Sequence, residues 1–164
     1  MEIRKTRIEE LDTILEIYQR ARTFMETHGN PNQWKKTRPE RSRIEQDLAE
    51  EKSYVCVEAG EIAAVFYFAE EEDPTYQMIY EGSWLNDAPY AVVHRIASAG
   101  TVKGAGSFCM EWAAMQADNI RIDTHEDNYV MQNMLKKQGF LYCGKILTDD
   151  GTERLAFQKV RAQE

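Results

Sequence analysis

A strand followed by a glycine turn and a helix is the feature that most constrains this chain. Residues 90–98 are strand-like, and residues 101–113 read TVKGAGSFCMEWA, with Gly104 and Gly106 at the start of a helix expected to end near Ala117. Such a turn gathers unpaired backbone N–H groups at the positive end of a helix dipole. An anion, typically a phosphate, is favoured at that point, so the turn is a candidate phosphate site.

Two common phosphate motifs do not match this turn. A P-loop needs Lys and Ser or Thr directly after its last glycine, whereas Lys103 precedes Gly104. The dinucleotide pattern G-x-G-x-x-G fails because Cys109 stands where its third glycine would be. Two glycines alone are equally consistent with a close approach of helix and strand that holds no ligand.

The remaining elements follow from periodicity and turn residues. Apolar positions spaced three and four apart predict a helix over about 9–27, and turn residues in 28–34 predict a loop. Pro39 suits the first turn of a second, shorter helix, in which Ile44 and Leu48 face inward. A last helix is expected over 128–138. The predicted strands are 2–8, 53–58, 61–70, 90–98, 120–124, 140–147 and 154–160.

Composition limits the protein classes that remain. With 164 residues and 43% hydrophobic content, a single domain over 1–164 is expected. A net charge of -8 disfavours general binding to nucleic acid or to anionic membranes. Neither a signal peptide nor a membrane span is visible, which predicts a cytoplasmic protein. Cys56, Cys109 and Cys143 are odd in number and lie in apolar sequence, so we expect reduced core thiols.

The order of elements resembles the GNAT superfamily of acyl-CoA-dependent N-acyltransferases over essentially the whole chain. Residues 94–113 (HRIASAGTVKGAGSFCMEWA) resemble its pyrophosphate-binding motif, and residues 121–140 (RIDTHEDNYVMQNMLKKQGF) resemble the strand and helix that follow. The resemblance implies an α/β fold in which a splayed, mixed central sheet is flanked by four helices. It also implies acetyl-CoA as cosubstrate, with no metal, and an amine of a small molecule or peptide as acceptor.

The resemblance assigns the cofactor site. Ile96 and Ala97 would pair their backbone with the pantetheine arm, and Asn128 matches an asparagine that contacts the cofactor. Two positions depart from the family pattern: Thr101 stands where Gln or Arg is usual, and Leu135 stands where many members have a tyrosine general acid. The glycine turn is also about two residues shorter than usual. The expected pyrophosphate residues are Val102, Lys103, Gly104, Ala105, Gly106 and Ser107.

Amine acetylation requires a group that removes a proton from the ammonium. His94, His125, Glu81 and Tyr142 are the catalytic candidates. His94 lies within an apolar strand, where a hydrogen-bonded core histidine is the plain interpretation, whereas His125 follows a strand tip, where ligand crevices open. Glu81 could be a solvated side chain or a base that acts through water. The expected acceptor-binding residues are Gln33, Trp34, Trp84 and Tyr90.

Other functions stay open at this point. One is a non-catalytic module that binds or senses acyl-CoA, which the vacant tyrosine position favours. Another is a metal-dependent hydrolase, because alternate residues of 123–127 carry carboxylates and an imidazole on one strand face. An acidic surface favours cationic acceptors such as polyamines, aminoglycosides or lysine-bearing peptides. Family members often dimerise, so a homodimer is an expected assembly, although the sequence identifies no interface.

Overall fold

A mixed seven-stranded sheet organises the molecule. The structure is a computed structural model that describes residues 1–35 and 37–161. The strand order is β1-β2-β3-β4-β5-β7-β6, in which β4 and β5 run parallel and every other neighbouring pair is antiparallel. The strands are β1 (Glu2–Lys5), β2 (Ser53–Glu58), β3 (Glu61–Glu70), β4 (Ala91–Ser98), β5 (Asn119–Thr124), β6 (Leu141–Leu147) and β7 (Glu153–Val160).

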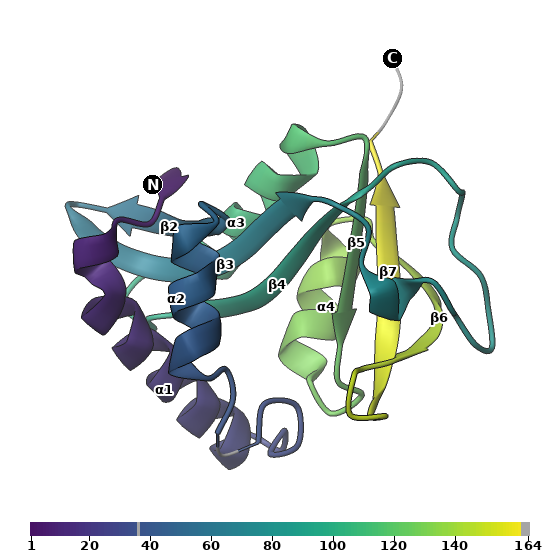
Figure 1. Cartoon of the computed structure of the whole chain (residues 1–164), viewed down its shortest axis with the longest axis horizontal. Helices are drawn as coiled ribbons and strands as arrows, with labels where there is room; N and C mark the ends of the chain where they lie inside the picture. Colours follow the sequence, from purple (N-terminus) through teal and green to yellow (C-terminus); the bar gives the residue numbers. More distant parts are fainter. Residues whose placement is uncertain (36, 162–164) are drawn as a thin grey trace.

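Helices cover both faces of this sheet, as Figure 1 shows. Two helices lie on one face, and two lie on the other. The long connection 71–90 crosses the first face and reaches β6, where Tyr80 pairs with Lys145. The α/β class with four helices around a mixed sheet, predicted from the sequence, is therefore confirmed. The helices are α1 (Leu11–Thr27) and α2 (Arg41–Ala49) on the first face, and α3 (Ala105–Gln116) and α4 (Tyr129–Lys137) on the second.

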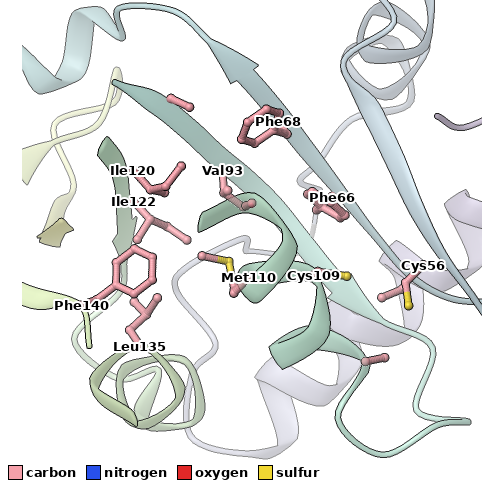
Figure 2. Close-up of a cluster of buried hydrophobic side chains, with 14 of the residues drawn as sticks. Cys56, Phe66, Phe68, Val93, Cys109, Met110, Ile120, Ile122, Leu135 and Phe140 are labelled. Carbon is pink, nitrogen blue, oxygen red and sulfur yellow. The ribbon is translucent and has the colours of Figure 1, made fainter. Parts of the chain in front are cut away.

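The largest apolar cluster fixes α3 and α4 against the sheet. Figure 2 shows Met110 of α3 and Leu135 of α4 directed toward strand side chains such as Val93. Cys56 and Cys109 belong to the same cluster. All three cysteines of the chain are buried and free, as the sequence predicted. Close packing here holds the start of α3 at a fixed position relative to β4.

The sheet opens between β4 and β5. These parallel strands pair only at Ala91 with Ile120 and at Val92 with Arg121. Beyond those pairs the two strands diverge, which Figure 1 shows as a gap between β4 and β5 in which α4 is visible. Strand edges without a neighbour leave backbone groups free to bind something else.

A β-bulge changes the direction of the second half of β4. Residues 65–67 of β3 lie opposite residues 94–97 of β4, so β4 carries one additional residue. Arg95 occupies the bulge with a φ of 51°. Its guanidinium donates two hydrogen bonds of 2.9 Å to the buried carboxylate of Asp47 on α2 and stacks over the ring of Tyr67. The ion pair thus ties α2 to the bulge.

Removal of this buried ion pair should destabilise the protein. We expect Asp47→Asn to lower the free energy of unfolding by about 3 kcal/mol, because Arg95 would keep its buried charge without a partner. Glu45→Gln, on the same helix, is the matched control: Glu45 pairs with the exposed Arg41, and its loss should cost less than about 1 kcal/mol. Urea unfolding of both variants measures the difference, and equal losses would contradict the role given to Asp47.

A few element boundaries differ from the sequence prediction. The first strand ends at Lys5 instead of residue 8, because a short 3-10 helix (Ile8–Glu10) begins there. The second helix begins at Arg41, and Pro39 lies before it instead of in its first turn, because Glu40 has an extended backbone and occupies the N-cap. Within the described chain, no helix has the length and apolarity that a membrane crossing requires.

Candidate active site

An apolar cavity of about 330 Å³ lies beside the end of β4, between α1 and α4. The predicted cofactor residues Ile96, Ala97, Gly106 and Asn128 all line it. Tyr129 and Val130 also line it and are largely exposed, so they offer apolar surface to a ligand. The other lining residues are Arg20, Ala21, Phe24, Met25, His28, Asn30, Ser98, Gly100, Asp127, Met131 and Met134.

The glycine turn provides the polar end of this apolar cavity. Gly104 is the N-cap of α3 with a φ of 83°, a conformation that favours glycine. The N–H of Phe108 donates to the carbonyl of Gly104 (3.0 Å), so the N–H groups that precede it at the helix start are available to a ligand. A Cβ on Gly106 would lie 3.8 Å from the sulfur of Met134 and would project into the cavity wall. Diphosphate chemistry fits such a cradle.

The other predicted residues of the turn take different positions. Ala105 is buried, and Val102 packs against the large core cluster. Ser107 is half-buried, and its carbonyl accepts a hydrogen bond of 3.0 Å from Gln138. Lys103 is exposed at the surface of the turn, where a cation would stay solvated until an anion binds. Their assignment to a pyrophosphate site remains a prediction.

Asn128 links the apolar cavity to a second one. Its Oδ1 accepts from the N–H of Met131 (3.0 Å), which caps α4, and its Nδ2 donates to Oε1 of Gln33 (2.9 Å). Gln33 also accepts from Asn30 (2.9 Å). The side chain of Asn128 is therefore held in one orientation, between the loop after α1 and the start of α4.

The second, polar cavity has a volume of about 480 Å³ and lies at the opening between β4 and β5. It shares Met25, Ile96, Asn128 and Met131 with the apolar cavity, so the two spaces meet there. Its charged and polar lining residues are Gln33, Arg38, Arg43, Tyr67, Glu71, Glu72, Asp73, Thr75, His94, Arg95, Asp123, Thr148, Asp149 and Arg154.

His94 and Asp73 form an oriented pair in the polar cavity. Nε2 of His94 lies 2.7 Å from Oδ2 of Asp73. Thr75 donates two hydrogen bonds to the other carboxylate oxygen, and Tyr90 accepts the N–H of Asp73 (2.9 Å). Burial by itself would raise the pKa of Asp73, but the hydrogen bonds from His94 and Thr75 outweigh it and lower that pKa to about 2. Asp73 is thus ionised near neutral pH, so Nε2 is the donor.

This arrangement leaves the second ring nitrogen of His94 available. Within the described residues, Nδ1 of His94 has no hydrogen-bond partner. A neutral imidazole whose Nε2–H is held by a carboxylate presents Nδ1 as a proton acceptor. The carboxylate also stabilises the imidazolium that forms when Nδ1 takes a proton. The pair can therefore serve as a general base that faces the polar cavity.

The lowered pKa of Asp73 links folding to pH. A carboxylate with a folded pKa of about 2, against a model value of 3.8, contributes stability that is complete above about pH 4 and is lost as the pH falls through 2. We expect Asp73→Asn to cost about 2 kcal/mol of unfolding free energy at pH 7 and about half of that at pH 3. Urea unfolding at both pH values tests this, and an equal loss at both would contradict it.

The other candidate catalytic residues lie away from both cavities. His125 is buried, and its Nδ1 accepts a hydrogen bond from the N–H of Asp127 (3.0 Å). Burial is the main cause that lowers the pKa of His125, and the positive charge of Arg154 lowers it further. Glu81 is exposed and pairs with Lys145 (3.0 Å). Tyr142 is half-exposed on β6. None of these three side chains lines the apolar or the polar cavity. Their catalytic roles stay untested predictions.

The four predicted acceptor residues also separate. Gln33 and Trp34 line the polar cavity. Trp84 instead donates from Nε1 to the carbonyl of Tyr76 (2.8 Å), so it secures the 71–90 connection. The hydroxyl of Tyr90 accepts a hydrogen bond from the backbone N–H of Asp73. Gln33 and Trp34 thus line the polar cavity, whereas Trp84 and Tyr90 do not. Their assignment to an acceptor remains a prediction.

Several residues that shape the site were not found by sequence reasoning. Asp73 belongs to an acidic run, and nothing local shows that it returns to a histidine 21 positions later. Arg154 is 8% exposed, donates to the carbonyl of Gln33 (2.7 Å) and lies 3.9 Å from Asp123. Arg20 borders the apolar cavity, where it donates to the carbonyl of Ser98 (3.3 Å). Asp73 lies in a loop, Arg20 on α1 and Arg154 on β7, so only the tertiary fold brings them to the two cavities.

The structure shows where Leu135 and the 123–127 segment lie relative to the two cavities. Leu135, at the position of the expected tyrosine, is fully buried in the core beneath α4 and faces neither cavity. The side chains of residues 123–127 do not all converge: Asp123 accepts a hydrogen bond from Tyr76 (2.6 Å), whereas His125 turns inward and lies 3.6 Å from Asp127. Across residues 1–35 and 37–161, no group of three or more His, Cys, Asp or Glu side chains is arranged to hold a metal ion.

Solved structures give the family. An acetyltransferase of the GNAT family from Streptococcus agalactiae is 31% identical, with a TM-score of 0.90 over 99% of this chain and 96% of that one. A putative acetyltransferase from Staphylococcus aureus is 22% identical, with a TM-score of 0.71 over 98% and 99%. A putative acetyltransferase from Salmonella typhimurium, solved with its cofactor acetyl-CoA, is 12% identical, with a TM-score of 0.65 over 99% and 95%.

Other comparisons add no match. No protein-family model matches the chain, and no curated protein does. The likenesses below 25% identity bear on the fold alone, whereas the Streptococcus agalactiae protein is similar in sequence and structure over the full length. The chain belongs to the GNAT acetyltransferase family.

Proposed function

We propose that this chain transfers the acetyl group of acetyl-CoA to a primary amine by direct attack. The observation that carries the proposal is the junction of the two cavities at the opening between β4 and β5. There the apolar cavity, with the glycine turn at one end, meets the polar cavity that holds His94 and Asp73. One space suits a long ligand with a diphosphate, and the other suits an amine.

The residues around the apolar cavity fit coenzyme A. The N–H groups at the start of α3 and the missing side chain at Gly106 suit its diphosphate. The free edge of β4 around Ile96 and Ala97 suits the amides of its pantetheine arm. Acetyl-CoA when bound would supply an acetyl group as a thioester. The putative acetyltransferase from Salmonella typhimurium, which shares this fold, was solved with acetyl-CoA as its cofactor, which supports the same ligand here.

The residues around the polar cavity fit the acceptor. His94 takes the proton of the attacking amine at Nδ1, while Asp73 fixes the ring through Nε2 and stabilises its charged form. The bulge in β4 leaves a backbone N–H near Ile96 free of β3, so it can donate to the thioester carbonyl. Glu71, Glu72 and Asp73 lie along this wall, where negative charge favours an incoming ammonium.

Thiol release in the presence of amines tests this proposal. Purified protein is mixed with acetyl-CoA and a panel of acceptors, and both free thiol and acetylated amine are measured. Equal yields of the two products would support the transfer reaction. Binding of acetyl-CoA without turnover for any amine would favour the sensing alternative, and the absence of binding would contradict both.

A further inference from the structure

Arginines gather at one end of the polar cavity, where its lining continues to Pro39 and Glu40. A third cavity, of about 440 Å³, adjoins the polar cavity and is lined by Arg38, Arg43, Arg95 and Arg154. All four also line the polar cavity. We call this the arginine cavity. Its other lining residues are Gln33, Trp34, Pro39, Glu40 and Asp149.

Two of these arginines have no anionic partner in the described residues. Arg95 is paired with Asp47, and Arg154 lies 3.9 Å from Asp123. Arg38 and Arg43, in contrast, form no salt bridge within residues 1–35 and 37–161, although Glu40 and Asp149 border the same cavity. Positive charge is therefore left over at this end of the acceptor space.

The charge of Arg38 affects the pKa of the buried guanidinium of Arg154. Burial is the main cause that lowers the pKa of Arg154; the carboxylates of Asp123 and Asp150 oppose it, and the charge of Arg38 adds a smaller lowering. Like charges held close together in a partly buried place attract an anion that neutralises them. Arginine guanidinium groups bind carboxylates and phosphates with two parallel hydrogen bonds, which makes the arginine cavity chemically suited to such groups.

Carboxylates line the part of the acceptor space that the arginine cavity does not share. Glu71, Glu72 and Asp73 lie near His94 on the wall formed by the start of the 71–90 connection. The acceptor space is thus negative beside the proposed base and positive at the arginine cavity. A substrate that fills both ends carries an amine at one end and an anionic group at the other.

We infer that the acceptor is an amine that also carries a carboxylate or phosphate group, which the arginine cavity binds through Arg38 and Arg43. This inference rests on the proposed function and narrows its acceptor. It differs from the cationic acceptors expected from net charge, because the charge of the whole surface does not describe this cavity.

Anion binding tests the inference without turnover. The full chain is first saturated with CoA, so that the glycine turn is filled, and is then titrated with inorganic phosphate or with acetate. Binding is followed by NMR of the arginine Nε–Hε groups. We expect shifts at Arg38 and Arg43 and at their cavity neighbours Arg95 and Arg154. The last two also report on the double variant Arg38→Gln/Arg43→Gln, in which binding should be at least about tenfold weaker.

The anion titration has a control variant on the same helix. Arg41→Gln is the matched control, because Arg41 lies on α2 beside Arg43 but pairs with Glu45 and does not line the cavity. It should bind both anions as the wild type does. Equal anion affinity in the double variant, or no anion binding in the wild type at about 100 mM, would overturn the inference. The two anions distinguish phosphate from carboxylate preference.

Turnover of three five-carbon amines separates this inference from the proposed function. 1-Aminopentane, 5-aminopentanoate and cadaverine differ only in whether the far end is neutral, anionic or cationic. We expect kcat/KM to be at least about tenfold higher for 5-aminopentanoate, and the advantage to vanish in the double variant. A preference for cadaverine would overturn the inference while transferase activity stands; failure to bind CoA would contradict the proposed function itself.

Discussion

Replacement of His94 by Gln should lower kcat by about a hundredfold to a thousandfold while acetyl-CoA binding is unchanged. The reason is that a positioned general base contributes a factor of this size, and Gln keeps the polarity and approximate volume of His without a site that titrates. Asp73 holds Nε2 of His94 at 2.7 Å, so the ring itself is already oriented. Steady-state thiol release and calorimetric titration measure the two quantities separately.

The same assay separates the four candidate bases. His125→Gln, Glu81→Gln and Tyr142→Phe change side chains that line neither of the two main cavities. If His94 is the base, these three variants should retain kcat within about threefold once folding is confirmed. A variant of His94 with near-normal kcat, or a greater loss in one of the other three, would show that the proton leaves by another route.

Gly106→Val should weaken acetyl-CoA binding by about a hundredfold or more. Its new side chain would occupy the space where the diphosphate approaches the N–H groups of α3, and a blocked helix N-terminus loses that charge-assisted contact. Because the nearest protein atom to an added Cβ is the sulfur of Met134 at 3.8 Å, the fold itself should accept the change. Calorimetric titration gives the affinity.

Met115→Val is the matched control for that variant. Met115 lies on the exposed side of the same helix and is 71% exposed. Its replacement by Val therefore introduces the same residue type into α3 without a change to the cavity. Affinity should stay within about twofold of the wild type. Unchanged binding by Gly106→Val, with circular dichroism that shows a folded protein, would place the diphosphate elsewhere.

Local patterns predicted those parts of the fold that depend on local physics. The sequence predicted the glycine turn and the helix after it from the two glycines and from apolar periodicity. Both are found where they were predicted, and Gly104 has the positive φ that favours glycine. The start of the second helix was missed by two residues, because capping by Glu40 depends on backbone angles that the residue type does not dictate. Trp84 was expected at the acceptor site, yet its ring packs beside Tyr76 and Arg121.

The candidate base shows the limit of local reasoning. His94 has an apolar strand around it in the sequence, which is compatible with a buried histidine or a catalytic one. Its carboxylate partner comes from a connection whose path across the sheet is set by tertiary packing of Tyr76. The arginine cavity likewise combines α2, β4, β7 and two loops, so no window of sequence reveals its charge.

The affinity for CoA compared with that for pantetheine shows whether the turn around Gly104 and Gly106 binds the diphosphate. Pantetheine retains the thiol and both amides but lacks the diphosphate that we assign to the turn around Gly104 and Gly106, together with the adenosine and its 3′-phosphate, so the Gly106→Val comparison isolates the contribution of the turn. We predict calorimetric binding of CoA at least about a hundredfold tighter than that of pantetheine, a difference that fades in Gly106→Val. Equal affinities for the two compounds, or no detectable binding of CoA at millimolar concentration, would contradict the account.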